Sequence, residues 1–295
     1  MVLTGTMRWR KRGVALALLA PATLIIAAIF VYPIVVAVRM SLFDVPTYNP
    51  VMSGPASLRN YHELATSGAF WRALATTITY TVVVTASASV VGLATAVLLR
   101  AVVRGRRLFR TALALPWVIP PAIVALIWKW MFEPQSGVVN HLLHLVGATP
   151  VRWFHNPSAA LVALIVTGIW HEYPFFLITV SAGLEMIPKE LYEAAELDQA
   201  NGWQKFWYVT LPALRPLVGV SVVLSALMSF RQYDLVAVLT GGGPAGATET
   251  LALAIYKNAF QYFRMGYASA LGTVSLIISV LLVVTLLSRL AKEFY

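Results

Sequence analysis

The sequence predicts an all-α integral membrane protein with six transmembrane helices and both termini in the cytoplasm. Of its 295 residues, 59% are hydrophobic and only 12% are charged, whereas ordinary soluble domains contain about 25% charged residues. The apolar residues also gather in long runs, and about 20 such residues suffice for a helix to cross the hydrocarbon core of a bilayer. Lysines and arginines lie beside these runs, where they orient membrane helices.

Six apolar segments follow one another along the chain. The first lies behind a basic segment, as in a signal peptide, but it is longer than the roughly 7–15 apolar residues of such a peptide, so we expect an uncleaved span. The third contains Pro116, Pro120 and Pro121, which predict a kink or an interruption. We expect spans over residues 14–38, 73–99, 111–128, 158–184, 216–239 and 266–287.

The positions of the basic residues indicate the orientation and the surroundings of the chain. The net charge is +10, but the basic clusters at 8–12 and 100–110 adjoin apolar runs, which is typical of contacts with anionic membrane lipid. We therefore expect no nucleic-acid partner. With the termini inside, the inner segments carry about twice as many lysines and arginines as the outer ones, as the positive-inside rule requires.

The same orientation divides the chain into two regions. Residues 1–71 comprise the first span and a periplasmic interfacial segment. Residues 72–290 comprise five spans and a long cytoplasmic loop at 185–212. Cysteine chemistry is excluded because the chain has no cysteine, and its five histidines are scattered, so we expect no metal site.

The cytoplasmic loop predicts two short helices. Pro188 suits the first turn of one helix, and Asn201-Gly202 is a good helix stop. A second helix over 203–209 is expected to end at Leu211-Pro212. Helices that lie on lipid usually carry basic residues on their polar face, but this loop is acidic, which predicts docking to a protein. The acidic residues are Glu190, Glu193, Glu196 and Asp198.

Within the loop, Glu193-Ala194-Ala195 is followed sixteen residues later by Leu211-Pro212. This spacing resembles the EAA loop of binding-protein-dependent ABC importer permeases, and Asp198 also matches the family pattern. One position departs from that pattern, because Gln199 stands where the family usually has glycine. The nearby Gly202 could supply the turn instead.

The resemblance extends along most of the chain and is greatest to the carbohydrate-uptake branch, whose members import maltose and glycerol phosphate. It implies the type I importer permease fold, in a multi-pass protein of the bacterial inner membrane that moves a sugar or related polyhydroxy solute. It also implies a second homologous permease, two ATPase subunits and an extracytoplasmic solute-binding protein as partners. The chain is then no enzyme and binds no cofactor, since ATP and magnesium belong to the ATPase. Consistently, it contains no phosphate-binding G-x-x-x-x-G-K-[ST] motif.

Polar side chains inside the predicted spans suggest a solute path, because charges at such depth usually face a bundle interior or a water-filled cavity. In a structural alternative, Arg231 pairs with Asp234 three residues along one helix face, and Glu172 pairs with the partner subunit. The sequence leaves both open. The candidate path residues are Glu172, Tyr173, Phe230, Arg231, Tyr233 and Asp234.

Two other functions compete with an importer subunit. An ion-coupled secondary transporter often shows inverted repeats and broken helices at matching positions, and neither is evident in the sequence. A membrane enzyme would need acids, histidines or metal ligands gathered at one membrane face, which the sequence also lacks.

Overall fold

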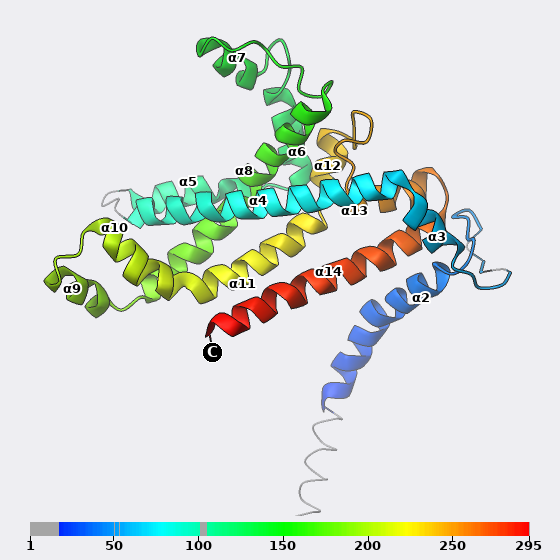
Figure 1. Ribbon diagram of the computed structural model, residues 1–295, viewed down its shortest axis with the longest axis horizontal. Coiled ribbons are helices and arrows are strands. Elements are labelled where there is room, and N and C mark those ends of the chain that lie inside the picture. Colours follow the sequence, from blue (N-terminus) through cyan, green and yellow to red (C-terminus); the bar gives the residue numbers. More distant parts are fainter. Residues whose placement is uncertain (1–17, 50, 53, 101–104, 295) are drawn as a thin grey trace, which may run out of the picture. The chain divides into compact units, whose positions relative to one another are not determined.

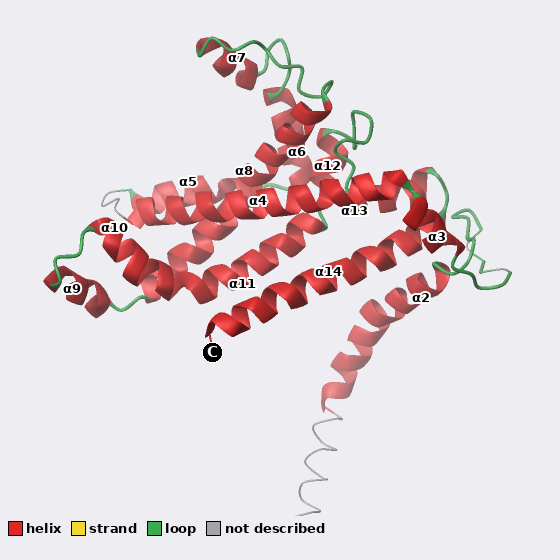
Figure 2. Ribbon diagram, in the orientation of Figure 1, coloured by secondary structure: helices red, strands yellow, loops and turns green. Residues whose placement is uncertain are grey.

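The computed structural model describes residues 18–49, 51–52, 54–100 and 105–294, which form helices joined by loops (Figures 1 and 2). Within these residues, one isolated β-bridge between Pro46 and Arg264 is the sole extended pairing. The helices are α2 (Tyr32–Met40), α3 (Arg59–Thr66), α4 (Gly68–Arg100), α5 (Arg106–Val118), α6 (Pro121–Met131), α7 (Val138–Leu145), α8 (Pro157–Met186), α9 (Lys189–Leu197), α10 (Gly202–Lys205), α11 (Leu211–Phe230), α12 (Asp234–Leu239), α13 (Leu251–Tyr256) and α14 (Met265–Phe294). Three π-helical turns adjoin them at Ala27–Val31, Phe206–Thr210 and Lys257–Gln261.

The predicted transmembrane helices are confirmed, with changed bounds. Among the described residues, five helices are long and apolar enough to cross a membrane, and α5 with α6, which bend by 99° at their break, make a sixth if the pair is counted as one span. The interruption follows Val118, beside Pro120 and Pro121, whereas Pro116 lies inside α5. The five single spans are Leu18–Met40, Gly68–Arg100, Pro157–Met186, Gly202–Phe230 and Met265–Leu290. The beginning of the predicted first span, at 14–17, lies outside the described residues.

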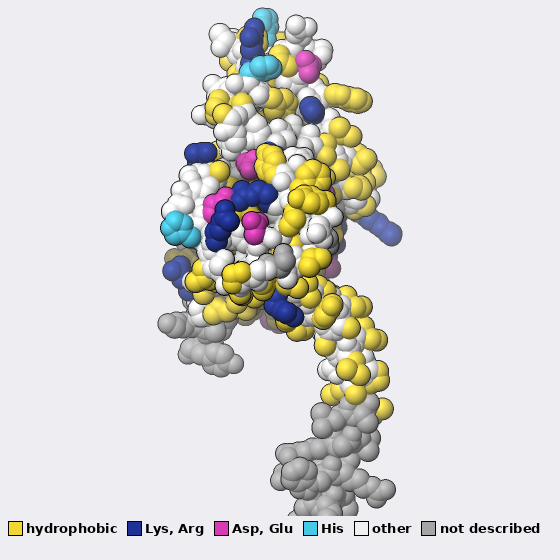
Figure 3. Space-filling model, turned by 90° about the vertical axis from the view of Figure 1, so that its right-hand side faces the viewer, with side chains coloured by type: hydrophobic (Ala, Val, Ile, Leu, Met, Phe, Trp, Pro, Cys, Tyr) yellow, Lys and Arg dark blue, Asp and Glu magenta, His cyan; other side chains and the backbone are white. Residues whose placement is uncertain are grey.

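The described chain packs as two compact units. One contains the residues up to Thr66 together with Ile255–Val274, and the other contains Ser67–Ala254 and the residues from Ser275 onward. In the first unit, the described part of the first span buries none of its apolar window. Figure 3 shows it as a column of hydrophobic side chains. Such a surface requires lipid or another apolar helix as its neighbour.

Polar contacts hold the remainder of the first unit together. The Asn60 side chain donates to the carbonyl oxygens of Ser41 and Phe43, both at 2.9 Å. The Arg264 guanidinium donates to both carboxylate oxygens of Glu63 at 2.6 Å. Charged side chains of both signs lie side by side on the face shown in Figure 3. The Asn60 hydrogen bonds connect α3 to the segment after α2, and the Glu63–Arg264 pair connects α3 to the residue before α14.

The long helices α4 and α8 form the centre of the second unit. They approach closely where Gly92 faces α8 and where Gly168 faces the Tyr80 ring. One buried cluster joins α4 and α8 to α6 and α12 and includes Trp128 and Phe132. A second joins the C-terminal ends of α4 and α8 to the start of α11.

The orientation of these spans stays a prediction, and cysteine labelling tests it. Because the chain has no cysteine, single substitutions at exposed loop residues give unambiguous sites. We expect Ser136→Cys and Ala245→Cys to react with a membrane-impermeant thiol reagent in intact spheroplasts. Glu190→Cys should react only after the membrane is permeabilised. If Glu190→Cys is the variant that is labelled in intact spheroplasts and the other two are not, the orientation is opposite to the predicted one.

Candidate coupling and transport sites

Helix α9 carries the predicted docking motif on its surface. Glu193 and Ala194 are exposed and Ala195 is half-buried. Leu197, at the end of the helix, is 86% exposed. Within the described residues, no lysine or arginine pairs with Glu193. The motif therefore offers a charge, small side chains and an apolar flank to another molecule. Pro188 precedes the helix as its N-cap residue, one position earlier than predicted.

The turn after α9 is made by Gln199 itself. This residue has φ +59°, the left-handed conformation that usually belongs to glycine at a helix end. Its N–H donates to Glu196 and the Ala200 N–H donates to Ala195, at 3.0 and 2.9 Å, so both hydrogen bonds of a Schellman motif are present. The prediction that Gly202 supplies the turn is wrong, because Gly202 begins α10.

Replacing Gln199 by glycine should stabilise this turn. A left-handed L-residue costs about 1–2 kcal/mol, and the greater chain entropy of glycine offsets part of that gain. We expect Gln199→Gly to raise the free energy of unfolding by about 0.5–1 kcal/mol, measured by chemical denaturation of the subunit in detergent. Ala200→Gly, at a neighbour with negative φ, is the control and should destabilise. An equal response of both variants would contradict the explanation.

Asn201 begins a helix and does not end one, contrary to the prediction. Its side chain accepts a hydrogen bond from the Gln204 N–H at 2.9 Å, while the Gln204 side chain accepts from the Asn201 N–H at 2.8 Å. This reciprocal pair is a capping box. The same signal, an Asn-Gly dipeptide, is compatible with the end of one helix and the start of the next.

The second predicted loop helix is the first part of the fifth span. The chain is helical from Gly202 to Phe230 without interruption, so Leu211-Pro212 does not end a helix as predicted. Proline normally clashes with the carbonyl group four residues earlier. Here the π-helical turn at Phe206–Thr210 widens the helix, and the Leu211 N–H donates to the Phe206 carbonyl oxygen. The turn thus brings Pro212 into the first turn of α11.

Two segments of irregular backbone, between α5 and α6 and between α11 and α12, are satisfied by side chains. The Ile119 carbonyl oxygen, at the break between α5 and α6, lies 3.2 Å from His171 Nε2. The Gln232 carbonyl oxygen, between α11 and α12, accepts from Thr250 Oγ1 at 3.3 Å. Unpaired backbone at membrane depth is tolerated where protein buries it or where it lines a water-filled cavity.

Both breaks meet at one pocket of about 360 Å³. Glu172, which is 7% exposed, lies on its wall and accepts hydrogen bonds from Ser225 Oγ at 2.7 Å and Ser229 Oγ at 2.6 Å. These bonds join α8 to the last turns of α11, directly before Arg231. The pocket therefore combines the carboxyl group of Glu172, the guanidinium of Arg231 and backbone that is not helical. Its lining residues are Trp117, Pro121, His171, Glu172, Leu227, Met228, Ser229, Arg231 and Gln232.

Of the six predicted path residues, Glu172 and Arg231 line this pocket and the other four lie elsewhere. The Tyr173 hydroxyl donates to the Leu113 carbonyl oxygen at 3.0 Å, and Tyr233 packs against the cluster around Trp128. Asp234 is exposed at the start of α12. Arg231 and Asp234 do not share a helix face as predicted, because α11 ends at Phe230. No ion pair joins them within the described residues.

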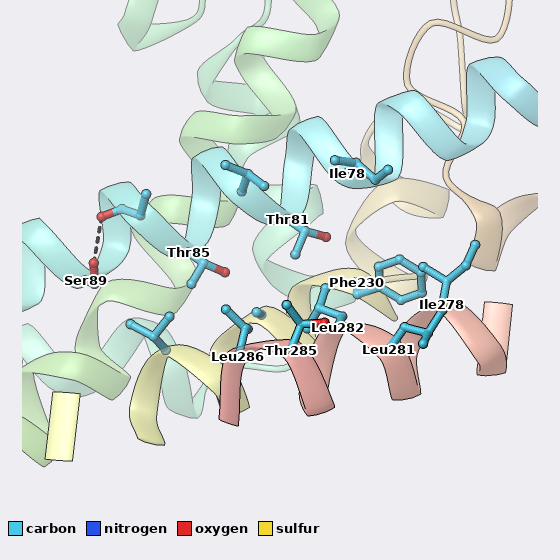
Figure 4. Close-up of a pocket in the computed structure, with 14 residues that line it drawn as sticks. Ile78, Thr81, Thr85, Ser89, Phe230, Ile278, Leu281, Leu282, Thr285 and Leu286 are labelled. Atoms are coloured by element: carbon cyan, nitrogen blue, oxygen red, sulfur yellow. Dashed lines mark hydrogen bonds between the residues drawn. The ribbon is translucent and has the colours of Figure 1, made fainter. Parts of the chain in front are cut away.

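Phe230 lines a second cavity of about 680 Å³ between α4, α11 and the C-terminal part of α14. Its walls are mostly apolar, and Figure 4 shows the Phe230 ring beside Ile278 and Leu281. Thr81 points its hydroxyl group toward this cavity in the same view. So apolar a lining is poorly suited to a solute rich in hydroxyl groups.

Sequence reasoning missed Trp117 and Gln232 as pocket residues. The proline pair at 120–121 predicted a break nearby, so the residues flanking it could have been considered. No comparable proline or glycine signal marks the second break at 231–233. The position of Gln232 in the pocket could therefore not be predicted from the sequence.

Comparison with known protein families and proteins identifies the relatives of this chain. Residues 88–293 match the family described as "Binding-protein-dependent transport system inner membrane component". The chain is 32% identical over 275 residues to the sulfoquinovosyl glycerol transport system permease protein SmoG of Agrobacterium fabrum, covering 92% of this chain and 89% of that protein. It is 31% identical over 264 residues to the trehalose/maltose transport system permease protein MalF of Thermococcus litoralis, covering 90% and 88%. It is also 35% identical over 279 residues to the permease protein YcjO of Escherichia coli, covering 93% and 92%.

Solved structures confirm the predicted type I importer permease fold. A chain of a bacterial ABC transporter for alginate import matches with a TM-score of 0.83 and 24% identity, over 97% of this chain and 99% of that one. A chain of the alginate transporter in complex with its alginate pentasaccharide-bound periplasmic protein matches with a TM-score of 0.79 and 24% identity, over 94% and 93%. The family match over residues 88–293 agrees with this fold and with the apolar spans. The protein therefore belongs to the family of inner membrane components of binding-protein-dependent transport systems, and it is a multi-pass permease.

Proposed function

We propose that this chain forms half of the membrane path of an ATP-driven importer for a saccharide or related polyhydroxy solute. The observation that carries the proposal is the pocket at which the break between α5 and α6 and the irregular segment after α11 meet a buried carboxyl group and an exposed guanidinium. The relatives named for sulfoquinovosyl glycerol and for trehalose and maltose support the same class of solute.

The chemistry of the pocket suits such a solute. The Trp117 ring offers an apolar face, and sugars present their C–H groups to aromatic faces while their hydroxyl groups seek polar partners. Arg231 and Gln232 supply donors, and the amide oxygen of Gln232 is an acceptor. A small number of polar groups on an otherwise apolar wall fixes the orientation of a ligand.

Energy reaches the path from other subunits in this proposal. We infer that α9 docks to an ATPase, because Glu193 has no ion-pair partner within the described residues and the adjacent Ala194 is exposed. The complete importer then contains a second, homologous permease, two ATPase subunits and a periplasmic solute-binding protein. ATP and magnesium bind to the ATPase subunits, and this chain supplies neither a cofactor site nor catalysis.

Neutralising the pocket charges should change transport while leaving the assembly intact. A hydrogen bond to a charged group contributes about 1.5–3 kcal/mol, so we expect Arg231→Gln to lower the apparent affinity for solute by about 10- to 100-fold. Glu172→Gln keeps the shape of the side chain but adds donors where two serine hydroxyl groups already donate, and should also slow uptake. The measurement is the concentration dependence of solute uptake by liposomes that contain the complete importer.

Asp234→Asn provides the matched control, since it removes a charge three residues from Arg231 on a side chain outside the pocket. It should transport at the wild-type rate. If Arg231→Gln and Glu172→Gln both transport with normal affinity, normal rate and unchanged solute preference, the proposal that the pocket lies on the solute path is wrong.

A further inference from the structure

The inner side of α9 is fastened to two spans through a single side chain, Tyr192. Arg100 Nη1 donates to the Tyr192 hydroxyl oxygen at 2.7 Å, and the guanidinium carbon also lies 4.4 Å from the centre of the Tyr192 ring. On its other side, the hydroxyl oxygen lies 2.9 Å from Thr210 Oγ1. We refer to Arg100, Tyr192 and Thr210 as the tyrosine junction.

The hydrogen bonds of the tyrosine junction run in one direction. Thr210 Oγ1 donates to the Lys205 carbonyl oxygen at 3.3 Å, so its own hydrogen is already used. We assign the Tyr192 hydroxyl as the donor to Thr210 and as the acceptor from Arg100, because this direction pairs the hydrogens of both hydroxyl groups. Each hydroxyl hydrogen in the tyrosine junction therefore has an acceptor. A substitution that removes one of the two hydroxyl groups breaks the series of hydrogen bonds from Arg100 to Thr210.

Each end of the tyrosine junction belongs to a different span. Arg100 is the last residue of α4, and Thr210 is the last residue of the π-helical turn that leads into α11. Between them, the Tyr192 ring packs against the cluster that contains Leu99, Leu184 and Leu214. Neighbours of Tyr192 on α9 face away, since Leu191 and Glu193 are exposed. One face of α9 is thus free to dock while Tyr192 joins it to the bundle.

Further along its length α11 lines the pocket, and α4 contacts α11 beside it. Ser225 and Ser229 of α11 donate to Glu172, and Ser225 Oγ lies 3.4 Å from Thr85 Oγ1 of α4. A displacement of α4 and α11 at their inner ends would therefore alter the wall of the pocket, because a helix transmits displacement along its axis as a rigid element.

We propose that Tyr192 is a positioning residue that transmits the movement of α9 to α4 and α11 through its hydroxyl group. This inference rests on the proposed docking of α9 to an ATPase. The ion pair between Lys205 and Glu196, at 2.7 Å, also connects α9 to the start of the span Gly202–Phe230, but it does not reach α4. Without the phenolic oxygen, the ring keeps its packing but α9 loses the hydrogen bonds of Tyr192 to Arg100 and to Thr210.

The test uses the complete importer in liposomes and measures solute taken up per ATP hydrolysed. Thr210→Val should lower this ratio by about fivefold, the loss expected for one neutral hydrogen bond that favours the coupled state. Tyr192→Phe should lower it at least as much, because it also removes the hydrogen bond from the Arg100 guanidinium. Thr210→Ser retains the hydroxyl group and should restore the wild-type ratio. Tyr208→Phe, which changes an 80% exposed tyrosine in the same loop, is the matched control and should leave the ratio unchanged.

Two further measurements distinguish a role of Tyr192 in coupling from a purely structural role. The affinity of the ATPase for the permease pair and the thermal stability of the assembly should match wild type in Tyr192→Phe. An unchanged ratio in Tyr192→Phe would overturn the proposal. So would a parallel loss of assembly, ATP hydrolysis and uptake, because that pattern indicates a structural role alone. Failure of the wild-type chain to bind any ATPase would instead overturn the proposed function itself.

Discussion

Replacing Glu193 by lysine is expected to abolish the stimulation of ATP hydrolysis by the loaded binding protein. The side chain is exposed and lacks an ion-pair partner within the described residues, so its charge is available to another subunit. Breaking a buried, charge-assisted contact costs about 2–5 kcal/mol when its partner is left unpaired. That loss weakens docking by roughly tens- to thousands-fold. Lysine adds repulsion against the basic groove that an acidic helix implies.

Ala195→Trp should have the same outcome through bulk, by holding the docked surfaces apart. Both variants should insert in the membrane and pair with the sister permease, because the spans are unchanged. Glu133→Lys makes the same charge reversal at an exposed residue in the loop after α6 and should keep the wild-type response. Wild-type stimulation in both Glu193→Lys and Ala195→Trp would mean that α9 is not the coupling element.

A second large effect is expected at Gly92, where α4 and α8 approach closely. A Cβ atom there would clash with Phe176 Cβ and lie 2.6 Å from the Tyr173 carbonyl oxygen, whereas carbon atoms in contact normally lie about 3.5–4.0 Å apart. Both obstacles belong to α8 close to its backbone, so they cannot rotate aside. We expect Gly92→Val to destabilise the subunit by about 3 kcal/mol.

The control for this change is Gly272→Val, since a Cβ atom added at Gly272 has no heavy atom within 4 Å. The measurement is the thermal unfolding midpoint of the purified subunit in detergent. It should fall by several degrees for Gly92→Val and stay near wild type for Gly272→Val. Equal midpoints for the two variants would contradict the assigned packing of α4 on α8.

The spans could be predicted from sequence because each depends on a local property, a long run of apolar residues. The break in the third span was also accessible, since Pro120 and Pro121 cannot donate backbone hydrogen bonds. The second break was not, because the segment at 231–233 contains no proline or glycine. Its conformation depends on tertiary contacts such as the Thr250 hydroxyl group. Predicting Arg231 and Asp234 on one helix face failed for that reason.

The coupling loop illustrates how tertiary context changes the meaning of turn residues. Gln199 adopts the left-handed conformation although its side chain disfavours it, because the two backbone hydrogen bonds at the end of α9 require it. Asn201 and Pro212 are each compatible with a helix start and with a helix end. Their roles follow from the capping box with Gln204 and from the π-helical turn before Leu211, which composition does not reveal.

Broken spans alone do not distinguish an ATP-driven importer from an ion-coupled carrier, since both classes contain them. The pair α5 and α6 is bent in this way, so the absence of broken helices cannot be used against a carrier. The distinction rests on the family match and on the surface of α9. It concerns the source of energy, which can be measured directly.

The most direct measurement is uptake of radiolabelled saccharide by liposomes that contain this chain, its sister permease and the solute-binding protein, with and without the ATPase subunits. We predict uptake against a concentration gradient only when the ATPase subunits and ATP are both present, and no response to a proton or sodium gradient. Accumulation driven by an ion gradient in the absence of the ATPase subunits would contradict the account.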